Sequence, residues 1–292
     1  MYLLKEDFLD FPIGEFPYDK NHSAMGEYHY INYPGYRGRW NDPVCNHTYN
    51  GQGASWIITE YDGKHFMEQM RIRNDKPHRT FPTLTSGDRF WKDYELEVKM
   101  RMFTTKWGTA GIGFCCQNSM NLLVLVFEEK CLRLEYRHKE EIEIIGSVPF
   151  DYNCDDYYVL KVNVNGDHVV CFVDGKQYFD VHTEYAKQGG KVAITASVPA
   201  QFEYVNVTTD DENAVKIDNA RLEYKRSCEE AQKKYPKMKL VKKIDLKDFG
   251  TGRQVRFGHL LGNNEYQIVL AQCQKRVNRD AYGTISCLTA ID

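Results

Sequence analysis

The sequence predicts an all-β fold, an antiparallel sandwich or barrel, over about the first 209 of its 292 residues. Apolar and polar residues alternate with a period of two in several segments, which is typical of half-buried strands. Two segments are followed by Asn165-Gly166 and Asp174-Gly175, dipeptides that favour tight hairpins because both positions tolerate positive φ. A helical period is almost absent before Thr209, which favours strands that pair with each other.

The clearest strand covers residues 94–102, where Leu96 and Val98 alternate with Glu95 and Glu97. The side chains expected to point into the core are Tyr94, Leu96, Val98, Met100, Leu160 and Val162. Further strands are predicted at residues 132–137, 158–164, 169–173, 177–180, 191–197 and 202–207.

The pattern changes after Thr209. Residues 210–213 form a polar break, residues 219–235 are predicted to be a short helix with many charges, and Pro236 ends it. Four short strands follow, enough for one small antiparallel sheet, at residues 240–246, 255–257, 267–272 and 284–288. The predicted domains are therefore a β-sandwich at 1–209, a helical linker at 210–239 and a small sheet at 240–292.

The composition excludes some classes of protein. With 42% hydrophobic and 27% charged residues, the chain is not a mostly disordered one. A net charge of -3 argues against a nucleic-acid partner, which usually needs a basic surface to neutralise phosphates. Aromatic residues make up 13%, with 20 tyrosines, and this composition favours sheets and flat polar ligands such as sugars.

The N-terminal residues lack the basic start and apolar core of a secretion signal. The longest apolar run, residues 122–127, is too short to cross a bilayer. Nine scattered cysteines, an odd number without a Cys-x-x-Cys pair, favour reduced thiols and argue against a structural zinc site. We therefore expect a cytoplasmic protein with no membrane partner, unless a signal peptide was removed.

Five motifs in a fixed order resemble a known fold. They are Trp-Lys-Asp-Tyr-Glu-Leu at 91–96, Gly-Ile-Gly-Phe at 111–114, Tyr-Tyr-Val-Leu-Lys-Val at 157–162, Val-Asp-Gly-Lys at 173–176 and Gly-Gly-Lys-Val-Ala-Ile at 189–194. Together they are similar to the concanavalin A-like, laminin-G-like jelly roll. The resemblance implies an antiparallel jelly-roll β-sandwich over residues 1–209. Because this fold is found in lectins, hydrolases, lyases and plain spacers, it does not choose among them.

The C-terminal segment resembles a second family. Residues 248–258, 261–272 and 285–292 look like the first blade of a β-propeller of the rhamnogalacturonan-lyase type. The resemblance implies a partial blade and further propeller blades as partners, since one blade does not make a propeller. In such proteins loop aspartates often hold calcium, but here Leu261, Asn263 and Asn264 stand in their place. We expect no calcium and no other cofactor.

Exposed tryptophans and basic loop residues are the candidates for sugar binding. Trp107 lies in a polar loop, and Trp40 lies among arginines and aromatics, where an arginine stacked on a structural ring is an equally good explanation. His78 and Arg79 could bind the carboxylate of an acidic sugar. The full set of carbohydrate-binding candidates is Trp40, Trp56, His78, Arg79 and Trp107, whereas Trp91 opens an amphipathic strand and belongs to the core.

A catalytic pair is harder to find. The three-carboxylate strand motif of laminarinase-type hydrolases is missing, and the nearest feature, Glu141 and Glu143, is better explained as a solvated strand face. A polysaccharide lyase needs a base and a cation that neutralises the uronate carboxylate. Weak candidates are His259, Arg253, Arg256 and, as an acid, Tyr282.

Three functions therefore stay open. The first is a carbohydrate-binding, lectin-like module of a polysaccharide-degrading protein, with a plant-type glycan containing rhamnose and uronate as its partner. The second is a polysaccharide lyase of the rhamnogalacturonan or rhamnose-glucuronate type. The third is a structural spacer that orients such an enzyme. Sugar binding without turnover would favour the binding module, and formation of an unsaturated uronate would favour the lyase. If neither is observed, the spacer is favoured.

Overall fold

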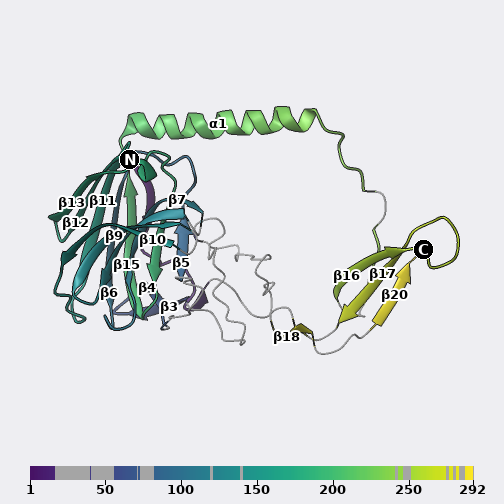
Figure 1. The fold of residues 1–292 in the computed structure, drawn as a ribbon, viewed down its shortest axis with the longest axis horizontal. Helices are drawn as coiled ribbons and strands as arrows, with labels where there is room; N and C mark the ends of the chain where they lie inside the picture. The colour runs from purple at the N-terminus through teal and green to yellow at the C-terminus, as the bar shows by residue number, and fades with distance from the viewer. Residues whose placement is uncertain are drawn as a thin grey trace. The chain divides into compact units, whose positions relative to one another are not determined.

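The computed structural model describes residues 1–16, 40, 56–70, 72, 82–118, 121–138, 141–240, 243–245, 251–273, 276–278, 281–282 and 287–291 (Figure 1). The chain divides into two compact units: among the described residues, those up to Glu230 form the first and those from Ala231 onward the second.

The first unit is a sandwich of two antiparallel sheets. One sheet has the strand order β13-β12-β11-β6-β15-β4-β3-β2, with β1 also paired to β15. Its strands are β1 (Tyr2–Glu6), β2 (Gly14–Phe16), β3 (Trp56–Tyr61), β4 (Lys64–Gln69), β6 (Glu95–Met102), β11 (Tyr158–Asn165), β12 (His168–Val173), β13 (Lys176–His182) and β15 (Ala200–Thr208).

The second sheet of the sandwich has the order β10-β9-β8-β7-β14-β5. Its strands are β5 (Thr83–Ser86), β7 (Ala110–Asn118), β8 (Asn121–Glu128), β9 (Cys131–His138), β10 (Glu141–Pro149) and β14 (Lys191–Ala196). A short 3-10 helix, η2 (Glu184–Ala186), lies between β13 and β14. The predicted fold class, an antiparallel jelly-roll β-sandwich with a helix and a small antiparallel sheet, is confirmed.

The core lies between the two sheets and contains the side chains that the alternation predicts. Those expected there are at most 3% exposed, namely Tyr94, Leu96, Val98, Met100, Leu160 and Val162. Trp91 is also buried, as predicted, and its ring packs against Gly87, where a Cβ would lie 2.4 Å from it. Burying side chains of this size contributes about 1.5–3 kcal/mol each to stability.

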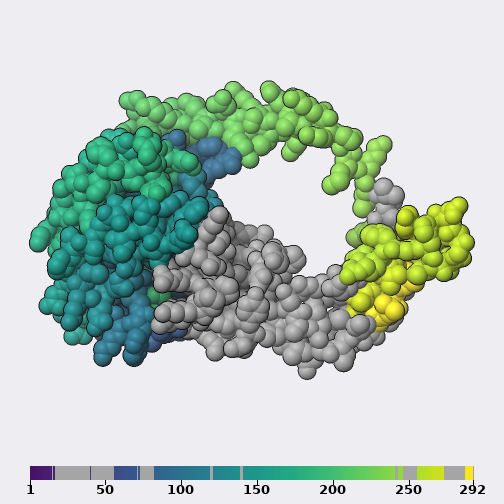
Figure 2. All heavy atoms as spheres, in the orientation of Figure 1, coloured from purple at the N-terminus to yellow at the C-terminus, as the bar shows by residue number. Residues whose placement is uncertain are grey.

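Helix α1 (Asp211–Lys233) begins eight positions earlier than predicted, because its polar start is a cap and not a break. Asp210 Oδ1 accepts a hydrogen bond from the Asn213 N–H at 2.7 Å, and acidic residues fill the first turn, where they complement the helix dipole. Ile217 is buried, and Arg221 Nε bonds Asp88 at 2.6 Å. These contacts attach the first turns of α1 to the sandwich (Figure 2), whereas the turns after Tyr224 are mostly exposed.

The second unit contains a three-stranded sheet in the order β16-β17-β20, formed by β16 (Thr251–Gly258), β17 (Gln267–Cys273) and β20 (Cys287–Ile291). A two-stranded ladder joins β18 (Arg276–Asn278) to β19 (Ala281–Tyr282). The prediction of a strand at residues 240–246 is wrong at the described positions 240 and 243–245, which do not belong to a strand. Leu240 is 82% exposed there.

Seven cysteine side chains are described, and all are free thiols, namely Cys115, Cys116, Cys131, Cys154, Cys171, Cys228 and Cys287. No helix in the described ranges is both long enough and apolar enough to cross a membrane.

Candidate functional site

Two of the predicted sugar-binding tryptophans are core residues. Trp40 and Trp56 are fully buried, so neither presents a ring face to a ligand, and their assignment as sugar platforms is corrected. Trp40 Nε1 donates a hydrogen bond to Glu6 Oε2 at 3.0 Å, and Trp56 packs on Phe202 with 6.0 Å between ring centroids. The prediction was wrong because it used the polar residues next to Trp40 in the sequence, and these residues do not determine whether its ring points into the core or into solvent. His78 and Arg79 lie outside the described residues.

Trp107 is placed very differently. Its side chain is 66% exposed, and its backbone has φ 72°, a left-handed conformation that is rare for a bulky residue. The loop that carries it joins β6 to β7 and is held at both ends. Phe103 N–H donates to Pro199 O at 2.9 Å, and Thr109 N–H donates to Ser197 Oγ at 2.9 Å.

The same loop passes close to the segment before β15. A Cβ on Gly108 would lie 2.4 Å from Ser197 Oγ, so a side chain at this position would push the loop away. The backbone is therefore fixed while the Trp107 ring remains in solvent. Strain of this kind costs on the order of 1–3 kcal/mol and is concentrated at functional sites.

Aromatic rings and a guanidinium group lie at the β6 end of this loop. Phe103 is 40% exposed, and the Arg101 guanidinium lies over it at 4.7 Å and over the Tyr157 ring at 4.9 Å. Arg101 Nε also donates to Gln201 Oε1 at 3.1 Å, which fixes the guanidinium between the rings. Burial raises the pKa of Tyr157, so the phenol stays neutral. Arg101, Phe103, Lys106, Trp107 and Tyr157 are called the Trp107 rim below.

The outer face of the smaller sheet carries a charged cluster that the sequence analysis missed. Glu135 is fully buried on β9, and its carboxylate accepts hydrogen bonds from Arg133 Nε at 2.6 Å and Arg137 Nε at 2.7 Å. Arg137 Nη1 also donates to Thr195 Oγ1 at 3.2 Å, across β8 and β7. Desolvation lowers the pKa of Arg137, against the opposing effect of Glu135. From the alternation of polar and apolar residues alone, these three residues would be predicted to form a solvated strand face.

The neighbouring strand on this face is apolar. Leu122, Val124 and Val126 of β8 stand opposite Arg137, Glu135 and Arg133 in the pairing with β9, and all three are buried. Carboxylates for glycoside hydrolysis are therefore not present at these positions of β8. Elsewhere, Glu143 on β10 accepts the Tyr185 hydroxyl at 2.7 Å and raises the pKa of that phenol. This bond gives Glu143 a structural role, in line with the expected polar strand face.

The described contacts of the lyase candidates in the second unit do not bring these residues together into a site. His259 Nδ1 is hydrogen-bonded to Glu265 O at 2.9 Å, and its ring lies 4.1 Å from that of Tyr266. Arg256 Nη1 donates to the carbonyl of Val255, its own neighbour. The side chains of Arg253 and Tyr282 lie outside the described residues. Within the described part of the chain, no group of three or more His, Cys, Asp or Glu side chains could hold a metal ion.

Comparison with known proteins gave remote structural likenesses. The carbohydrate-binding module CBM66 from Bacillus subtilis is 12% identical, with a TM-score of 0.44 over 58% of this chain and 95% of that one. LamAcat from Zobellia galactanivorans is 9% identical, with a TM-score of 0.47 over 71% of this chain and 97% of that one. The Bacillus licheniformis β-glucanase is 12% identical, with a TM-score of 0.43 over 61% and 95%.

No family model matches the chain, and no curated protein matches it. Identities near 10% and TM-scores below 0.5 assign neither a ligand nor an activity to this chain.

Proposed function

We propose that the sandwich is a carbohydrate-binding, lectin-like module that holds a glycan on the Trp107 rim. The observation that carries this proposal is the exposed ring of Trp107, whose backbone has a strained left-handed conformation in a loop that is held at both ends. A large rigid ring in solvent suits the apolar C–H face of a sugar, and a preorganised loop loses little entropy on binding. Core packing gives no reason for this ring to be there.

The charge of the rim supports an acidic glycan. Lys106 is exposed and precedes Trp107 in the loop, and Arg101 lies on β6 shortly before the same loop, so this region carries two cations. A uronate carboxylate would be attracted by them, which agrees with the rhamnose- and uronate-containing chains that the C-terminal resemblance suggests. On this proposal the module belongs to a polysaccharide-degrading protein and supplies binding rather than bond cleavage.

The test is a glycan-array screen of the complete chain, followed by calorimetry with the best glycan. Trp107→Ala should weaken binding by about 1–3 kcal/mol, the effect of removing a large aromatic anchor. Tyr61→Ala is the matched control, because Tyr61 is similarly exposed but lies elsewhere, at the end of β3. Lys106→Ala should weaken acidic glycans more than neutral ones, and more so at low salt.

Equal affinities of Trp107→Ala and wild type for every glycan that binds would overturn the assignment of the rim. An absorbance rise from an unsaturated uronate during incubation with the polysaccharide would instead establish a lyase. Absence of both binding and turnover would favour the spacer function.

A further inference from the structure

Charge is divided unevenly between the two units of the chain. Residues 1–230 hold 26 Lys and Arg against 36 Asp and Glu, which gives a net charge of -10. Residues 231–292 hold 12 Lys and Arg against 5 Asp and Glu, which gives a net charge of +7. The overall value of -3 therefore conceals a basic second unit, whose field attracts a polyanion while that of the first unit repels it.

Most of the positive charge of the second unit is concentrated in residues 233–247, called the lysine segment below. The segment has one acidic residue, Asp245, against seven lysines, namely Lys233, Lys234, Lys237, Lys239, Lys242, Lys243 and Lys247. Lysine-rich runs of this kind are typical of patches that bind acidic polymers.

The positive charge of the lysine segment is not neutralised by described carboxylates. The described lysines of the segment are exposed, and none forms an ion pair with a described residue, namely Lys233, Lys234, Lys237, Lys239 and Lys243. Nearer the start of α1 the situation differs, because Lys216 Nζ lies 2.8 Å from Glu212 Oε1. The ammonium groups of the segment are therefore available to a ligand.

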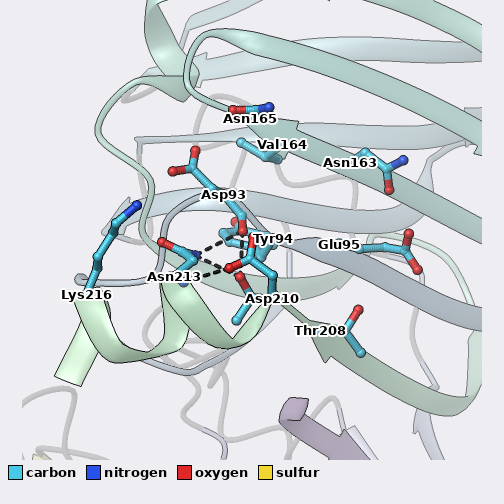
Figure 3. A pocket seen from close by; sticks show the side chains of 11 residues that line it. Asp93, Tyr94, Glu95, Asn163, Val164, Asn165, Thr208, Asp210, Asn213 and Lys216 are labelled. Atoms are coloured by element: carbon cyan, nitrogen blue, oxygen red, sulfur yellow. Dashed lines mark hydrogen bonds between the residues drawn. The ribbon is translucent and has the colours of Figure 1, made fainter. Parts of the chain in front are cut away.

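The two ends of α1 carry opposite charge. Its acidic start is fixed to the sandwich, where Asn213 Nδ2 donates to Asp93 O at 3.0 Å and Thr209 Oγ1 donates to the same carbonyl at 2.8 Å (Figure 3). At its basic end, Lys233 and Lys234 complement the negative end of the helix dipole, which is a structural reason for them. This reason does not extend to the lysines beyond the helix.

We infer that the lysine segment is a binding site for an acidic polysaccharide, a polyuronate whose carboxylates repeat along the chain. Lysine ammonium groups on flexible stems act as point charges and follow a linear polyanion without a fixed geometry. Tyr235, 73% exposed beside Lys234, adds a ring for the C–H face of a sugar. The choice of a glycan rests on the proposed function, whereas the choice of an anion rests on the charge of the segment alone.

Two other polyanions fit the residues less well. Arginine is the side chain that binds phosphate and guanine in a bidentate manner, and residues 233–247 contain none. An anionic membrane surface favours an amphipathic helix, but α1 ends at Lys233 and residues 234–240 lie in no helix. Nucleic acid and membrane are therefore outcomes of the test.

The probe is polygalacturonate, compared with its methyl-esterified form, which keeps the sugar backbone but lacks the charge. Binding to the complete protein is measured by calorimetry at low and at physiological salt. We expect polygalacturonate to bind at least about tenfold more tightly than the ester, and to bind more weakly as the salt concentration rises. Equal binding of the two polymers would overturn the inference.

A charge-removing variant locates the binding. Lys237→Gln, Lys239→Gln and Lys243→Gln are combined in one protein, because these exposed side chains lie beyond the helix and no described contact depends on them. The triple variant should bind polygalacturonate at least about tenfold more weakly than wild type, with a smaller dependence on salt.

The matched control combines three exposed lysines of the first unit, Lys92→Gln, Lys130→Gln and Lys176→Gln, and changes the net charge by the same amount. Its affinity for polygalacturonate should stay within about twofold of wild type. Equal losses in the two triple variants would show a general effect of net charge and overturn the inference, as would an unchanged affinity of the first variant.

Oligothymidylate and phosphatidylserine vesicles are the two remaining arms of the experiment. Both should bind more weakly than polygalacturonate at the same salt concentration. Binding of either one as tightly as polygalacturonate, with the same loss in the lysine variant, would overturn the assignment of a polysaccharide.

The inference and the proposed function fail separately. The loss caused by the three lysine substitutions should be the same with and without Trp107→Ala, because the two sets of residues act independently. The lysine variant should also keep the affinity of neutral glycans for the Trp107 rim. Lysine-dependent binding together with no glycan that depends on Trp107 would refute only the proposed function.

Discussion

The hydroxyl of Tyr94 links the two sheets of the sandwich by accepting the backbone N–H of Cys115 at 2.8 Å. Tyr94 immediately precedes β6 in one sheet, and Cys115 lies on β7 in the other. Cys115 has φ 49°, at a place where the β7–β8 register shifts between Phe114 and Asn118. The phenol therefore satisfies a backbone donor that the irregular strand cannot pair within its own sheet.

Tyr94→Phe should lower the free energy of unfolding by about 1–3 kcal/mol, because it leaves the buried Cys115 N–H without a partner. Urea denaturation measures the difference. Tyr61→Phe, at the exposed end of β3, should change stability by less than about 0.5 kcal/mol. Equal stability of Tyr94→Phe and wild type would show that another group takes over the N–H.

Reactivity of the thiols should follow their burial. Burial raises the pKa of Cys115 to about 12, and it raises those of Cys116 and Cys171 as well. Since the thiolate is the nucleophile, these three should resist alkylation by iodoacetamide at pH 8 until the protein unfolds. The half-buried Cys131, Cys154, Cys228 and Cys287 should react before them. Peptide mass spectrometry over time measures the order, and early modification of Cys115 in folded protein would contradict it.

Glu203 should make stability depend on pH in the acid range. Burial alone would raise the pKa of Glu203, but hydrogen bonds from Lys64 and Lys99, each at 2.7 Å, outweigh it and hold the pKa below its usual value. A lowered folded pKa gives stability that is present above the unfolded pKa, about 4.3, and is lost as pH falls through the folded value.

Glu203→Gln should therefore reduce the melting temperature at pH 6 but much less at pH 3. Both proteins would be melted across pH 3–6, with Glu60→Gln as an exposed control. A constant difference between Glu203→Gln and wild type over this range would show that the effect of Glu203 is not one of charge.

The core could be predicted from the sequence because the alternation of apolar and polar residues in a strand indicates which side chains are buried, as for Leu96 and Val98. Trp40 could not be placed, since its burial depends on Glu6 and Phe8, which are distant in sequence. The start of α1 was missed because an acidic cap has the composition of a loop. Tyr157 of the Trp107 rim meets Arg101 only because β11 pairs with β6, and a single sequence does not show this pairing.

The Arg133–Glu135–Arg137 cluster tests whether this face of the sheet depends on charge pairing. All three side chains are at most 15% exposed, so removing the central carboxylate leaves two guanidinium groups close together in a poorly solvated place. Glu135→Gln should therefore cost about 3–5 kcal/mol of unfolding free energy, the usual effect of breaking a buried ion pair.

Glu141→Gln is the matched control for this prediction, because Glu141 is also a strand glutamate of the same sheet but is exposed on β10. It should change stability by less than about 0.5 kcal/mol. Chemical denaturation of the two variants decides between the outcomes. A similarly small effect of Glu135→Gln would mean that water or relaxation screens the two arginines, so that the cluster behaves as a surface ion pair.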